Sequence, residues 1–84
     1  MIRADEAVAL FEKKMPSRKV IAAAGFDSTH YLFEAPESEN EVDYNDPYFL
    51  MDKNTGEISG YLPTNELAKF HAAFRDNSIA LDGG

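Results

Sequence analysis

The side chains best suited to chemistry in this sequence are two histidines, five serines and a surplus of carboxylates. His30 and His71 each lack a histidine or cysteine four residues away, whereas metal sites need three or four converging ligands. None of the serines stands in a Gly-x-Ser-x-Gly elbow, and there is no glycine-rich phosphate loop. We therefore expect no metal ion, no cofactor and no catalytic residue, and we predict that the protein is not an enzyme.

One segment, Asp52-Lys53-Asn54-Thr55-Gly56-Glu57, begins like a calcium-binding loop. An EF-hand places glycine at the sixth position and a bidentate glutamate at the twelfth, but those positions are Glu57 and Pro63 here. The segment instead predicts a tight hairpin turn, in which Gly56 supplies a positive φ and Asp52 or Asn54 binds the turn amides. A catalytic pair of carboxylates is also not expected, because such a pair needs an enclosing cleft to separate its pKa values.

Acidic residues are concentrated in one stretch of the chain. The net charge is −7, from fifteen acids and eight bases, and six of the acids lie between Glu34 and Asp46 with no base among them. Nine acids and eight bases remain elsewhere, so the rest of the chain is nearly neutral. Without a basic stripe, nucleic-acid binding is not expected, and a basic protein partner is favoured. The predicted partner-binding residues are Glu37, Glu39, Glu41, Asp43, Tyr44, Asp46 and Tyr48.

Two helices are predicted, one near each end of the sequence. Apolar residues recur with helical spacing from Ala4 to Met15, with acids in the first turn, lysines in the last and Pro16 after it. The second helix is expected after Pro63, capped by Thr64 or Asn65. Its apolar stripe consists of Leu67, Phe70 and Phe74.

Four strands are predicted between the helices, namely Val20–Phe26, His30–Ala35, Tyr48–Asp52 and Glu57–Leu62. The sequence thus predicts an α+β fold in the order α-β-β-β-β-α, a two-layer sandwich whose helices cover the apolar face of an antiparallel sheet. The polar segment 36–47, bounded by prolines, is expected to be an exposed loop.

Length and composition fit one domain, residues 1–84, with 79–84 as a flexible tail. Six phenylalanines and four tyrosines provide a core, and some of the tyrosines are expected to be exposed. There is no cysteine, no apolar signal sequence and no stretch as long as a membrane span. These absences predict a cytoplasmic protein that does not bind membranes.

The segment from Tyr48 to Leu62 is an aromatic strand followed by Asp-Lys-Asn-Thr-Gly-Glu-Ile, and it resembles the signature hairpin of PepSY domains. It is also similar to the hairpin of small bacterial immunity proteins of the immunity-protein-35 type, and to strand ends in small uncharacterised phage or mobile-element proteins. By pattern, Ala4 to Met15 matches the PepSY opening helix and Lys19 to Glu34 the next two strands. These families imply a non-catalytic binder or inhibitor and supply no catalytic residue.

Two functions remain open. The first is a non-catalytic protein-binding module, of the immunity or inhibitor kind, that docks a basic partner through its acidic stretch. The alternative is a structural or accessory phage or mobile-element protein that works as a homo-oligomer, in the simplest case a homodimer. Unpaired sheet edges in so small a domain motivate the second hypothesis.

Overall fold

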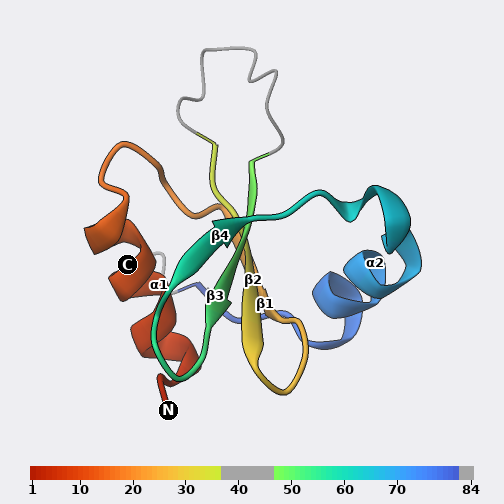
Figure 1. Ribbon diagram of the computed structural model, residues 1–84, viewed down its shortest axis with the longest axis horizontal. Coiled ribbons are helices and arrows are strands. Elements are labelled where there is room, and N and C mark those ends of the chain that lie inside the picture. Colours follow the sequence, from red (N-terminus) through yellow and green to blue (C-terminus); the bar gives the residue numbers. More distant parts are fainter. Residues whose placement is uncertain (37–46, 82–84) are drawn as a thin grey trace.

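The protein has an α+β fold, seen in a computed structural model that describes residues 1–36 and 47–81 (Figure 1). Its strands form an antiparallel meander in the order β1-β2-β3-β4. The predicted class and order of elements are therefore confirmed. The elements are α1 (Ala4–Lys14), β1 (Ala22–Gly25), β2 (His30–Glu34), β3 (Tyr48–Asp52), β4 (Ile58–Gly60), the 3-10 helix η1 (Pro63–Asn65) and α2 (Leu67–Asp76).

The two helices lie on opposite sides of the sheet (Figure 1). Successive strand residues point to opposite faces, so Phe33 and Met51 belong to the α1 side and Leu32 to the α2 side. Because both faces of β2 are apolar, each face takes a helix. The two layers expected from the sequence are thus three, in the order helix, sheet, helix.

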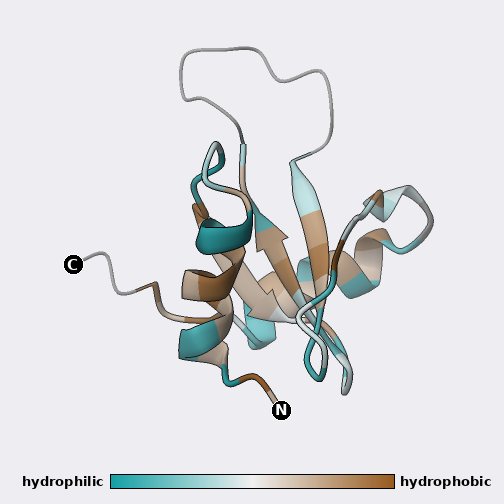
Figure 2. Cartoon of the chain, turned by 60° about the vertical axis from the view of Figure 1, so that its left-hand side comes forward, coloured by the Kyte–Doolittle hydropathy of each residue, from teal (hydrophilic) through white to brown (hydrophobic). Residues whose placement is uncertain are grey.

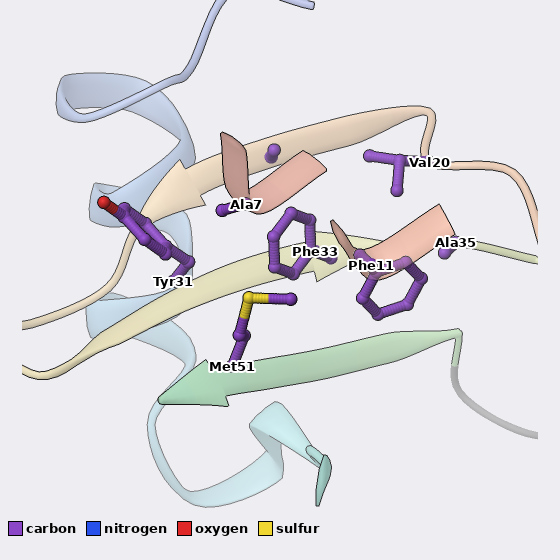
Figure 3. Packing of buried hydrophobic residues seen from close by; sticks show 8 residues of the cluster. Ala7, Phe11, Val20, Tyr31, Phe33, Ala35 and Met51 are labelled. Atoms are coloured by element: carbon purple, nitrogen blue, oxygen red, sulfur yellow. The ribbon is translucent and has the colours of Figure 1, made fainter. Parts of the chain in front are cut away.

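The larger half of the core lies between α1 and the sheet. Phe11 has no exposed surface, and its ring centroid lies 4.8 Å from that of Phe33 and 5.5 Å from that of Phe49. Figure 3 shows Phe11, Phe33 and Met51 meeting between the helix and the strands. The predicted apolar face of the first helix accordingly packs on the sheet. In Figure 2 the strands are largely hydrophobic, whereas the hairpin ends are hydrophilic.

The turn between β3 and β4 has the predicted form. A side-chain oxygen of Asp52 accepts hydrogen bonds from the amides of Asn54 (2.7 Å) and Thr55 (3.1 Å). Gly56 has a φ of 76°, in the left-handed region that glycine favours. Lys14 of α1 donates to the Gly56 carbonyl at 2.8 Å, so the turn is also attached to the first helix.

The second helix begins later than predicted. Glu66 is its N-cap residue, with no side-chain capping bond, so the predicted caps at Thr64 and Asn65 are wrong. The reason is local, because Pro63 opens the 3-10 turn and the Glu66 amide donates to the Pro63 carbonyl at 3.1 Å. Leu67, predicted to lie on the apolar stripe, is 53% exposed.

The chain after α2 returns to the sheet. Ser78 forms a bridge with Ala24, and the Ile79 amide donates to the Ala23 carbonyl at 2.8 Å. Ile79 and Leu81, expected in the tail, pack against the α1-side cluster. The remaining tail, 82–84, and most of the predicted loop, 37–46, lie outside the described residues. Neither helix of the described part is long and apolar enough to cross a bilayer.

Candidate functional site

The two flanks of the acidic stretch lie at one end of the sheet. Glu34 ends β2, Tyr48 begins β3, and the two residues face each other across the ladder. The Ala35 amide donates to the Pro47 carbonyl at 2.8 Å, which extends the pairing one step beyond the strands. Segment 37–46 therefore leaves and rejoins the sheet at neighbouring strands.

Of the predicted partner-binding residues, the structure describes Tyr48. The Tyr48 side chain is half-buried on the α2 side, and its ring meets Phe70 edge-on with centroids 4.8 Å apart. Tyr48 thus also helps to hold α2 on the sheet. The other predicted residues lie outside the described residues: Glu37, Glu39, Glu41, Asp43, Tyr44 and Asp46.

The connection between α1 and β1 braces the same end of the sheet. Arg18 donates to the Ala35 carbonyl at 2.8 Å, and its guanidinium lies 4.8 Å from the centre of the Phe49 ring. The Lys19 amide reaches the Pro36 carbonyl at 3.5 Å. Two basic residues therefore stand beside the start of the acidic stretch. No sequence pattern predicts this contact, because Arg18 is 17 positions from Ala35.

At the opposite end, the structure brings together an aspartate, a threonine and a histidine. The Asp27 carboxylate accepts from the Thr29 amide at 2.8 Å and from the Thr29 hydroxyl at 3.0 Å. His30 Nδ1 lies 2.8 Å from the Thr29 hydroxyl and 3.3 Å from Asp27. In a catalytic triad the nucleophile and the acid meet different ring nitrogens, whereas here both meet Nδ1. The cluster has the geometry of a capped turn.

Hydrogen bonding favours the ionised form of two turn aspartates. Burial raises the pKa of Asp27, but hydrogen bonds from Thr29 and His30 outweigh that effect and leave the pKa below its usual value. The amides of Asn54 and Thr55 hold the pKa of Asp52 below its usual value. The two carboxylates accept hydrogen bonds that hold the β1–β2 turn and the β3–β4 turn in place.

The tyrosines in the described part of the chain contribute more to packing than the sequence suggested. Tyr31 is only 7% exposed, its hydroxyl donates to the Ile2 carbonyl at 2.7 Å, and Lys53 lies over its ring. Tyr61 is half-buried and its hydroxyl donates to Glu66 at 3.1 Å. Burial, with the nearby Glu66, raises the pKa of Tyr61.

Other candidate sites are modest. A hollow of about 200 Å³ beside α1 is lined by Asp5, Val8, Ala9 and Glu12 of that helix and by Ala80 from the segment after α2. One of these carboxylates is already used, because Glu12 accepts from the Val20 amide at 3.3 Å. Within residues 1–36 and 47–81, no three histidine or acidic side chains converge in a way that could hold a metal ion.

Comparison of the chain with protein-family models, with curated proteins and with solved structures finds no match. Function is therefore inferred from the charges and contacts of the chain itself.

Proposed function

We propose that this protein is a non-catalytic protein-binding module that docks a basic partner through its acidic stretch, residues 34–46. The observation that carries the proposal is the position of the charge. Six of the fifteen acids lie in this stretch without a base, while the rest of the chain is nearly neutral. A surface whose charge is gathered in one region attracts a partner of opposite charge and orients it.

The ends of the stretch support this proposal. Glu34 and Tyr48 occupy paired positions on two strands whose five-residue ladder is in the middle of the sheet. Because neighbouring strands lie about 4.8 Å apart, both ends of segment 37–46 are anchored close together. The acidic stretch is therefore attached to the sheet at one end of the molecule.

The expected contribution of the acids is mainly to the rate of association. Electrostatic steering raises association rates by about ten- to a thousandfold, and the effect falls as salt screens the charges. A partner with a basic surface would thus associate faster at low ionic strength. The dissociation rate would depend more on whatever apolar contacts the partner makes.

An immunity or inhibitor protein is the kind of module that we propose. Such a protein acts by covering part of its partner and needs no chemistry of its own, which agrees with the turn-capping geometry around His30. The resemblance of the Tyr48–Leu62 hairpin to immunity proteins supports the same reading. A cytoplasmic location is part of the proposal, because the chain has no cysteine.

Capture from host-cell extract tests the proposal. Three baits are immobilised: the natural protein, a variant with four serine substitutions in the acidic stretch, and a control with four serine substitutions elsewhere. The test variant is Glu37→Ser, Glu39→Ser, Glu41→Ser and Asp43→Ser. The control, which removes equal charge at exposed sites, is Asp5→Ser, Glu6→Ser, Glu57→Ser and Asp76→Ser.

We expect the natural protein and the control to retain the same basic protein, which salt elutes, and the test variant to lose at least about nine-tenths of it. Equal retention by all three baits would refute the role of the acidic stretch. Retention of a partner without a basic surface would refute the electrostatic mechanism.

A further inference from the structure

The two edges of the sheet differ. The outer edge of β1 is covered, because the Gly25 amide donates to the Asn77 carbonyl at 3.0 Å and the Ile79 amide to the Ala23 carbonyl at 2.8 Å. At the other edge, β4 pairs with β3 and with no further strand of the described chain. The sheet therefore presents one open edge.

The backbone groups on this edge are arranged for pairing. The Tyr61 amide donates to the Tyr48 carbonyl at 2.9 Å, so the odd-numbered positions of this segment bond to β3. In an antiparallel ladder the intervening residues, Ile58 and Gly60, direct their N–H and C=O groups outward. Natural edges are usually protected by charged residues or proline, but positions 58–62 contain neither.

We propose that two copies of this chain pair antiparallel through their β4 edges, about a twofold axis at Gly60. In this register Gly60 faces its counterpart, and Ile58 of each copy faces Leu62 of the other. Each of these facing pairs has its hydrogen-bonding groups directed at the partner strand. The two four-stranded sheets thereby become one eight-stranded sheet.

The side chains on the edge favour this register. Ile58 packs against the α1-side cluster, and Leu62 has extended backbone angles of φ −112° and ψ 112°. Alternation along the strand therefore places Leu62 on the same side as Ile58. Leu62 is 65% exposed in the single chain and would be covered by Ile58 of the other copy. Gly60 has no atom within 4 Å of an added Cβ, so the strands can approach closely there.

The charge distribution favours antiparallel over parallel pairing of the two β4 strands. The acidic stretch leaves the sheet beside Tyr48, at the end where β4 finishes. The twofold axis sends the two acidic stretches to opposite ends of the joined sheet. A parallel pairing would set the two stretches side by side.

The pairing surface is small, so the dimer should be weak. Stable interfaces bury about 800 Å² on each partner, more than a segment of five residues provides. Self-association is therefore expected only at high protein concentration. The dimer would carry one acidic stretch at each end, which allows two partners to be bound at once. This inference does not depend on what the acidic stretch binds.

Sedimentation equilibrium of the full chain over a wide concentration range tests the pairing. Leu62→Lys places a charge on the edge, and Leu67→Lys is the matched control at an exposed leucine outside it. Gly60→Pro removes an outward N–H without removing a bond to β3. Circular dichroism checks that each variant keeps the monomer fold.

With rising concentration, we expect the average mass of the natural protein and of Leu67→Lys to approach the mass of a dimer. The average mass of Leu62→Lys and of Gly60→Pro should stay at the mass of a monomer. A natural protein that remains monomeric at the highest concentration would overturn the inference. So would a folded Leu62→Lys variant that dimerises as readily as Leu67→Lys. Serine substitution in the acidic stretch should leave the dimer intact, which separates this result from the binding test.

Discussion

At the scale of the residue, Gly56 has the most restrictive surroundings of the described glycines. A Cβ at this position would lie 3.0 Å from a methyl of Leu10, 3.2 Å from Ile2 and 3.3 Å from the Lys14 ammonium, and the φ of 76° would strain it further. The turn glycine thus does two things, closing the hairpin and allowing α1 to lie against it. The sequence predicted the first role from the turn pattern, and the second depends on a contact between distant segments.

Replacing Gly56 with alanine should lower the free energy of unfolding by about 1–3 kcal/mol, because the left-handed conformation and the close contacts both disfavour a Cβ. Gly60→Ala is the matched control, since nothing lies within 4 Å of its Cβ and its φ is not positive. Its effect should stay within about 1 kcal/mol. Urea denaturation of both variants measures this, and equal losses would contradict the structural role of Gly56.

The lowered pKa values of Asp27 and Asp52 predict a loss of stability in acid. A carboxylate whose pKa is lower in the folded state stabilises the fold above its unfolded pKa, about 3.9, and loses this contribution as pH falls through the folded value. Asp52→Asn keeps an oxygen acceptor but cannot ionise. It should be less stable than the natural protein at neutral pH, and the difference should shrink below about pH 4. A difference that is constant from neutral pH to pH 3 would contradict this assignment.

At the scale of the element, the sequence predicted what local patterns control. Apolar spacing and Pro16 located α1, and the turn residues located the β3–β4 hairpin. Local patterns did not predict on which side of the sheet each helix packs. That choice depends on the apolar side chains that β2 presents on both of its faces. The start of α2 was missed because a 3-10 turn at Pro63 competes with side-chain capping.

Attachment of α1 to the sheet depends most on Phe11, which is fully buried against Phe33 and Phe49. Phe11→Ala should cost about 3–5 kcal/mol through lost burial and the cavity left behind, a large part of the stability of so small a domain. Phe74→Ala, at a half-buried ring on the other side, should cost distinctly less. Thermal unfolding followed by circular dichroism compares the two, and the reverse order would contradict the described core.

At the scale of the whole molecule, the two ends of the sheet differ in what they carry. One end carries the capped turns and the Asp27–His30 cluster, and the other anchors the acidic stretch between β2 and β3. The sequence alone predicted the acidic stretch as the binding region. It could not predict that Arg18 and Lys19 form hydrogen bonds with the backbone where the stretch leaves the sheet. These contacts arise only because the α1–β1 connection folds back onto that end of the sheet.

The most direct measurement of the central claim is the association rate with the captured partner, taken at low and high salt. The natural protein and the variant with serine at positions 37, 39, 41 and 43 are compared. We expect the variant to associate at least about tenfold more slowly at low salt and to lose most of its salt dependence. Equal rates and equal salt dependence for the two proteins would contradict the proposal that the acidic stretch docks the partner.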